Sequence, residues 1–127
     1  MKFHRLTLAA ATLALVLTAC STAAGGGSSE APAEADATVT AVDMAFQPGT
    51  VTVSAGADSL TIALVNNDAM PHNIAIYADD SKAEKLFEGE MVTDGTIVYD
   101  IGELAPGEYF FDCSLHPDMT GTLVVEG

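Results

Sequence analysis

The sequence predicts an all-β domain, a β-sandwich or a β-barrel, over residues 38–127. Short runs in which polar and apolar residues alternate recur along this part of the chain, and this alternation marks half-buried strands. Groups of Gly, Pro, Asn and Asp separate the runs and are typical of turns. Only residues 79–87 have room for one or two turns of helix. A domain of about 90 residues buries enough core to fold without disulfides.

We expect about seven to eight strands, seven of which can be placed on the sequence. In chain order these cover residues 38–44, 50–53, 59–65, 73–77, 96–101, 108–113 and 122–126. In the third run, Leu60, Ile62 and Leu64 share one face, as expected for a strand that packs on a core.

Residues 1–19 have the features of a secretory signal peptide. Lys2 and Arg5 precede an uncharged apolar run, 6–17, which is shorter than the roughly 20 residues needed to span a bilayer. Residues 17–20, L-T-A-C, resemble the lipobox of bacterial lipoproteins. The resemblance implies cleavage before Cys20 and lipidation of that cysteine. An uncleaved N-terminal helix, or ordinary cleavage that leaves a free Cys20, are the alternatives.

Residues 20–37 predict a flexible linker. They consist of small, polar and acidic residues with G-G-G-S-S near the centre, and such a coil reaches roughly 20–25 Å. The expected organisation is therefore a signal peptide at 1–19, a lipid anchor and linker at 20–37, and a folded domain at 38–127. This predicts an exported protein, anchored by lipid to a bacterial membrane on its extracytoplasmic side.

The charge balance excludes several classes of function. The chain has 18 acidic residues, only 4 Lys and Arg, and a net charge of −14. A protein this acidic has no basic patch for nucleic acid or for a polybasic membrane contact. Residues 38–127 carry fifteen of the acids and two lysines, a net charge of −13. A protein partner is therefore expected to offer a basic docking face.

A cluster of potential metal ligands lies near the C-terminus. Cys113, His116 and Met119 fall within seven residues between two predicted strands, and His72 precedes another strand. These are soft or borderline donors that suit copper, and two His, one Cys and one Met form the ligand set of a trigonal blue copper site. Zinc is the main rival, although it prefers Cys, His or carboxylate to a thioether. Taken singly, each residue would more often be ordinary core or surface.

Residues 38–127 resemble the cupredoxins, the family of small blue copper proteins that includes plastocyanin, azurin and amicyanin. M-P-H-N-I at 70–74 is similar to the family's first ligand segment, and 109–126 to its C-terminal ligand loop, with short amicyanin-like spacing. The resemblance implies a Greek-key β-sandwich with one type 1 copper. It also implies that His72, Cys113 and His116 bind in the trigonal plane and Met119 binds axially.

The resemblance extends to two residues beside the ligands. In the family an Asn follows the first His and a Ser or Thr follows the Cys, and here these are Asn73 and Ser114. Their side chains are expected to hydrogen-bond and to join the two ligand segments, with the Asn73 amide donating to the Cys113 sulfur. Ordinary turn chemistry is the alternative for both residues.

The chain also departs from the family pattern. Plastocyanin has a Tyr directly before its Cys, on a remote route for the electron, and Asp112 stands there instead. Asp118 is polar on a docking face that is normally apolar. Four residues remain for an apolar rim, namely Met70, Pro71, Leu115 and Pro117.

The leading hypothesis is a monomeric electron carrier that passes one electron through Cu(I) and Cu(II). The electron would leave by His116 to a redox partner such as a cytochrome or a copper or respiratory enzyme. Copper transport, storage or buffering without a dedicated redox partner is the alternative. A copper enzyme is disfavoured because the domain has two histidines and both are already used. A structural adhesive domain with a degenerate site is disfavoured by the intact ligand set.

Overall fold

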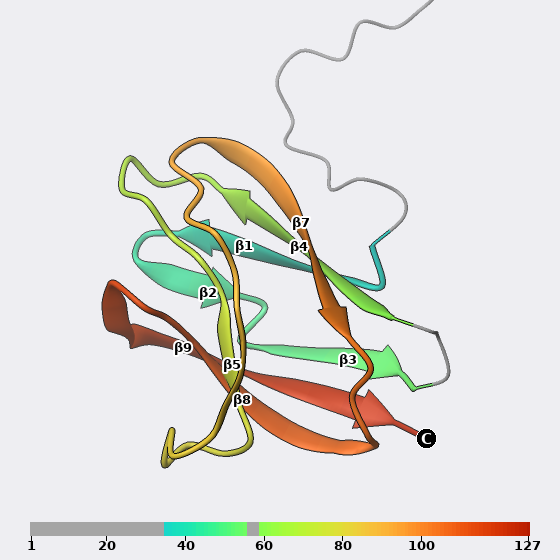
Figure 1. The fold of residues 1–127 in the computed structure, drawn as a ribbon. Coiled ribbons are helices and arrows are strands. Elements are labelled where there is room, and N and C mark those ends of the chain that lie inside the picture. The colour runs from blue at the N-terminus through green and yellow to red at the C-terminus, as the bar shows by residue number, and fades with distance from the viewer. Residues whose placement is uncertain (1–34, 56–58) are drawn as a thin grey trace, which may run out of the picture.

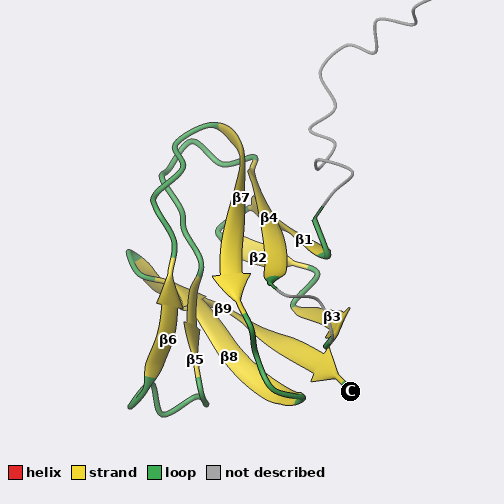
Figure 2. Ribbon diagram, turned by 45° about the vertical axis from the view of Figure 1, so that its right-hand side comes forward, coloured by secondary structure: helices red, strands yellow, loops and turns green. Residues whose placement is uncertain are grey.

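A computed structural model of the chain describes residues 35–55 and 59–127, which form nine strands and no helix (Figures 1 and 2). The strands are β1 (Ala37–Val42), β2 (Ala45–Gln47), β3 (Thr50–Ser54), β4 (Leu60–Asn66), β5 (Ala75–Tyr77), β6 (Lys85–Glu88), β7 (Gly95–Gly102), β8 (Gly107–Cys113) and β9 (His116–Glu126). The all-β prediction is confirmed, and each expected strand falls on an observed one. The expected signal peptide and Cys20 lie outside the described residues.

The strands form two mixed sheets that share one core. One sheet has the order β2-β1-β4-β7 and the other the order β3-β9-β8-β5-β6. β1 runs parallel to β4 and β3 runs parallel to β9, whereas the other pairs are antiparallel. Inward-facing side chains of both sheets meet in the core, among them Val39, Ile62, Leu64, Ile76, Phe111 and Leu123. The molecule is therefore a β-sandwich.

Two local expectations in residues 38–87 were wrong. The first predicted strand stops at Val42, because Asp43 and Met44 have φ of 53° and 58° and form a two-residue hairpin loop that leads into β2. The possible helix at 79–87 is instead a turn followed by β6, which pairs with β5 at the sheet edge. Phe87 of β6 packs on the Tyr99 ring with centroids 5.6 Å apart. This contact partly buries the only aromatic ring of β6.

The last strand begins six residues earlier than expected. A two-residue turn, Ser114 and Leu115, joins β8 to β9, and Cys113 pairs with His116 across it. Gly121 therefore lies within a strand. Its role is steric: a Cβ at this position would overlap the Phe111 ring, which lies against β9.

Three connections meet at one end of the sandwich, on the left in Figure 1. They are the β1–β2 turn, the segment between β4 and β5, and the β8–β9 turn. β1 begins at the opposite end, where the C-terminus also lies. Residues 35–55 and 59–127 include no helix long and apolar enough to cross a membrane.

Candidate metal centre

The first ligand segment lies between β4 and β5 and is held by backbone pairing. His72 forms an isolated bridge with Val92, with N···O distances of 3.0 and 2.9 Å. The side-chain amide of Asn66 donates to the carbonyls of Met70 and Val92, at 2.8 Å each. These bonds fix the backbone on both sides of His72, whose side chain is fully buried.

The imidazole of His72 is oriented by a carboxylate that the sequence did not indicate. Asp68 Oδ2 lies 3.0 Å from His72 Nε2, and the opposite ring nitrogen, Nδ1, lies 3.8 Å from Cys113 Sγ. When Nε2–H donates to Asp68, Nδ1 presents its lone pair toward the sulfur. Burial raises the pKa of Asp68, but hydrogen bonds from Met44, His72 and Asp43 outweigh it and lower the pKa below its ordinary value. Asp68 is thus an anion that fixes the tautomer of this candidate ligand.

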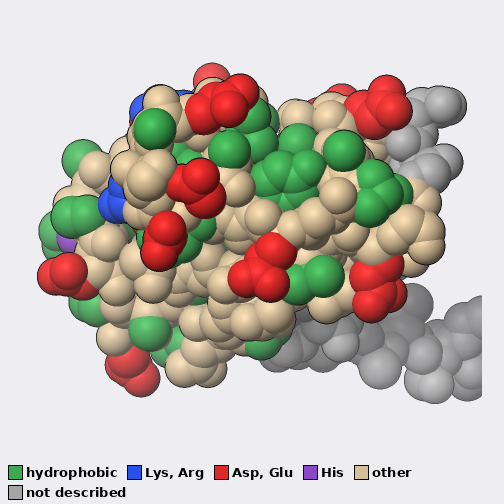
Figure 3. Space-filling model, turned by 90° about the horizontal axis from the view of Figure 1, so that it is seen from below, with side chains coloured by type: hydrophobic (Ala, Val, Ile, Leu, Met, Phe, Trp, Pro, Cys, Tyr) green, Lys and Arg blue, Asp and Glu red, His purple; other side chains and the backbone are tan. Residues whose placement is uncertain are grey.

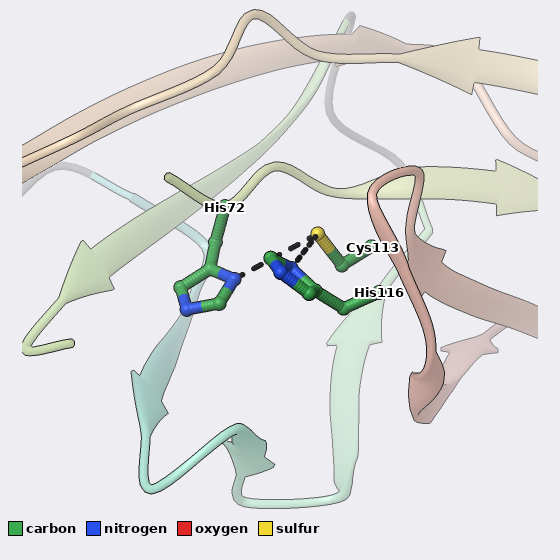
Figure 4. Close-up of side chains that lie close together, drawn as sticks. All are labelled: His72, Cys113 and His116. Atoms are coloured by element: carbon green, nitrogen blue, oxygen red, sulfur yellow. Dashed lines mark hydrogen bonds between the residues drawn. The ribbon is translucent and has the colours of Figure 1, made fainter. Parts of the chain in front are cut away.

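The second ligand segment is the β8–β9 turn. It places Cys113 Sγ, fully buried, 3.5 Å from Nδ1 of the partly exposed His116. The rings of His72 and His116 meet edge to face with centroids 4.9 Å apart. Figure 4 shows the His72 ring approaching from one segment, and the His116 ring and the Cys113 sulfur approaching from the other. One ligand atom from each residue lies within 4.8 Å of the others, close to the separation of donors that share one ion through bonds of about 2.0–2.3 Å.

Met119 is a buried residue of the core. It lies three residues beyond His116 on β9, is 1% exposed, and is a member of the core cluster that contains Cys113. Its thioether is therefore held inside the sandwich. The structure thus brings His72, Cys113 and His116 into one cluster and buries Met119 in the core to which Cys113 belongs.

Asn73 and Ser114 form hydrogen bonds between the two ligand segments. The Ser114 backbone N–H donates to Asn73 Oδ1 at 2.9 Å, and Asn73 Nδ2 donates to Ser114 Oγ at 3.2 Å and to the Gly89 carbonyl at 2.9 Å. The hydrogen bonds donated by the Asn73 side-chain amide thus go to Ser114 and Gly89. Ser114 Oγ donates in turn to Glu88 at 2.8 Å, a contact that the sequence did not indicate.

The donor set of this site fits copper. One thiol, two imidazoles and a thioether are soft or borderline ligands, and both the thiol and the thioether are buried. No carboxylate of the described residues joins the ligand cluster, since Asp68 is engaged with the far side of the His72 ring. A zinc site would prefer a carboxylate or a further Cys or His to the thioether.

Comparisons with known proteins agree with this geometry. A model of the family described as Cupredoxin-like domain matches residues 8–125. Amicyanin of Paracoccus versutus is 37% identical over 93 residues, which are 72% of this chain and 67% of that protein. Amicyanin-alpha of Methylorubrum extorquens is 36% identical over 83 residues, 65% of this chain and 66% of that protein. The matched regions thus span about two thirds of these relatives.

Solved structures show the same fold. A crystal structure of amicyanin from Paracoccus versutus superposes with a TM-score of 0.59 at 32% identity, over 78% of this chain and 93% of that one. Reduced auracyanin of Roseiflexus castenholzii superposes with a TM-score of 0.60 at 20% identity, over 72% of this chain and 96% of that one. This likeness supports the fold alone. Fold and site together define a small blue copper protein with a single type 1 site. The chain belongs to the cupredoxin family.

Proposed function

We propose that His72, Cys113 and His116 hold copper in a trigonal plane, that Met119 is the axial ligand, and that the protein carries single electrons. The observation that carries this proposal is the buried Cys113 sulfur between two imidazole nitrogens, 3.8 and 3.5 Å away. Copper bound there would supply one-electron chemistry between Cu(I) and Cu(II).

The chain's own contribution is a stiff frame around the ligands. Asp68 orients His72, the Asn73–Ser114 bonds join the two ligand segments, and a two-residue turn separates Cys113 from β9. Donors held in this way keep their positions when the charge of the site changes, so little rearrangement accompanies each electron.

We assign electron exit to the exposed edge of His116. The β8–β9 turn beside it presents Leu115, 54% exposed, and Met70 of the first ligand segment is 50% exposed. These side chains offer an apolar contact on a domain of net charge −13. The partner is therefore a redox protein whose docking face combines an apolar centre with a basic rim, such as a cytochrome or a copper or respiratory enzyme. A monomer suffices, since all four proposed ligands come from one chain.

The proposed tether fits this arrangement. β1 begins at the end of the sandwich opposite the ligand segments, so the chain before it attaches far from the docking end. The proposed organisation is 1–19, 20–37 and 38–127, except that the folded domain begins by Asp36, because Ala37 belongs to β1 and Asp36 accepts hydrogen bonds from Thr61. Cys20 is lipidated in this proposal, and the domain lies on the extracytoplasmic side. Mass spectrometry of the membrane fraction should find an acylated N-terminal Cys20, and Cys20→Ser should release the protein. Retention of that variant on the membrane would contradict the anchor.

Protein-film voltammetry and rapid mixing test electron transfer. We expect a reversible one-electron wave, and electron exchange with a basic redox protein that slows as salt is added, because exposed charges are screened within about 8 Å at physiological ionic strength. Absence of a reversible wave, with copper passing readily to a chelator, would instead support a copper carrier.

A further inference from the structure

Asp112 is a buried carboxylate directly before the proposed ligand Cys113. Side chains alternate along β8, so Phe111 and Cys113 face the core while Asp112 lies on the outer face of the five-stranded sheet. Even there it is only 2% exposed, and within the described residues its Oδ1 has no hydrogen-bond partner. A buried charge is costly unless it is paired. The Asp112 carboxylate therefore needs a nearby cation to offset its buried negative charge.

Lys82 is that cation. It projects from the turn between β5 and β6, and its Nζ lies 2.5 Å from Asp112 Oδ2. The ammonium also lies 5.6 Å from the centroid of the Phe110 ring and 5.9 Å from that of Tyr77, which favours a positive charge at this point. The hydrogen bond to Asp112 raises the pKa of Lys82 above its ordinary value, so the lysine stays charged at neutral pH.

The pair lies close enough to the site to act on its charge. The Cα atoms of neighbouring residues are about 3.8 Å apart, which puts the Asp112 carboxylate on the order of 10 Å or less from the Cys113 sulfur. A charge buried at such a distance is screened by salt much less than an exposed one. Figure 3 shows acidic side chains over much of the face seen from below, while lysine atoms lie at the end where a histidine is visible.

We propose that the Lys82–Asp112 pair helps to set the reduction potential of the copper site, with Lys82 cancelling the effect of the buried carboxylate. The inference rests on the proposed type 1 site. The oxidised site carries one more positive charge than the reduced site, so a nearby anion favours oxidation and a nearby cation favours reduction. Lys82 contacts none of the proposed ligands. It affects the site by pairing with Asp112 and offsetting the carboxylate's charge.

Three variants of the full chain test the proposal by voltammetry. Lys82→Met leaves the carboxylate unpaired and should lower the potential. Asp112→Asn leaves the lysine unpaired and should raise it. The double variant should return close to the wild type. Asp80→Asn is the matched control, because it makes the same substitution as Asp112→Asn at an exposed position of the turn that carries Lys82. Its shift should be smaller and should fade as salt is added.

Opposite shifts in the two single variants support the proposal, since a purely structural role would not give opposite signs. Equal potentials in all variants, or shifts of one sign in both single variants, would overturn it, provided the blue absorption band is present. A lower unfolding midpoint of both apo single variants with no change in potential would show that the pair is only structural. If the wild type binds no copper or has no blue band, the proposed function fails instead.

Discussion

Asp68 Oδ2 accepts hydrogen bonds from His72 Nε2 at 3.0 Å and from the Met44 backbone N–H at 3.1 Å. The other carboxylate oxygen, Asp68 Oδ1, accepts a hydrogen bond from the Asp43 backbone N–H at 2.8 Å. One carboxylate thus orients a proposed metal ligand and holds the β1–β2 turn, whose two residues both have positive φ. Asn66 Oδ1 accepts from the Asp68 N–H at 2.9 Å and so fixes the carboxylate's own backbone. The first ligand is therefore oriented by a hairpin distant from it in sequence.

Removal of this carboxylate should weaken copper binding. We expect Asp68→Ala to lower the copper affinity roughly 10–100-fold, because the carboxylate that holds a ligating imidazole in place typically contributes that much. Asp68→Asn keeps one acceptor oxygen, so its copper affinity should fall less than that of Asp68→Ala. Competition with a chromophoric chelator measures both, with the exposed Asp80→Ala as control. An unchanged affinity in Asp68→Ala would show that His72 is positioned without Asp68.

Asp36 should make stability depend on pH in the acid range. Its Oδ2 accepts hydrogen bonds from the backbone N–H and the hydroxyl of Thr61, and these lower the pKa of Asp36 below 3.8. A lowered folded pKa means that the stabilisation is full above 3.8 and is lost as the pH falls through the folded value. Urea unfolding of the apo protein should show Asp36→Asn less stable at about pH 6 and nearly equal to wild type at about pH 2. A constant difference at both pH values would refute this.

Gly121 should tolerate no side chain. Gly121→Ala forces a methyl group into the space of the buried Phe111 ring and should cost about 1–3 kcal/mol of unfolding free energy. Gly49→Ala is the matched control, because a Cβ at Gly49 has no atom within 4 Å. Chemical denaturation of the two apo variants measures the contrast. Equal midpoints would mean that β9 can move away from Phe111 at no cost.

Met119→Gln tests the axial ligand. The variant should keep copper but change the reduction potential, since the axial donor tunes the potential of such sites. Voltammetry measures the change, and copper analysis shows that the ion is retained. An unchanged potential would indicate that the buried thioether only fills the core.

Much of this architecture was predictable because local pattern and tertiary structure agree. Val51 and Val53 alternate with exposed residues in β3, and Leu60, Ile62 and Leu64 face the core from β4, as period-two patterning predicts. The ligand residues were predictable for a different reason. Three of the four proposed ligands are the two histidines and the one cysteine of residues 38–127, so their chemistry is visible without coordinates.

The remainder depends on contacts between distant segments. The turn at Asp43 and Met44 contains no Gly or Pro that would predict it from the sequence. It is stabilised by hydrogen bonds from the backbone N–H groups of these two residues to Asp68. β6 carries no alternation, since Phe87 is its one partly buried side chain, and pairing with β5 defines it. The pairing of Lys82 with Asp112 likewise joins positions 30 residues apart, which no local pattern could indicate.

The visible spectrum of the protein after loading with Cu(II), recorded for the wild type and for Cys113→Ser, tests the central claim most directly. We predict one copper per chain and an intense blue colour in the wild type, because the Cys113 thiolate supplies the charge-transfer transition. The serine variant, which lacks the sulfur, should be colourless at matched protein concentration. A colourless wild type that binds copper stoichiometrically, or a Cys113→Ser variant that keeps the intense band, would contradict the assignment of Cys113 as a ligand of a type 1 copper site.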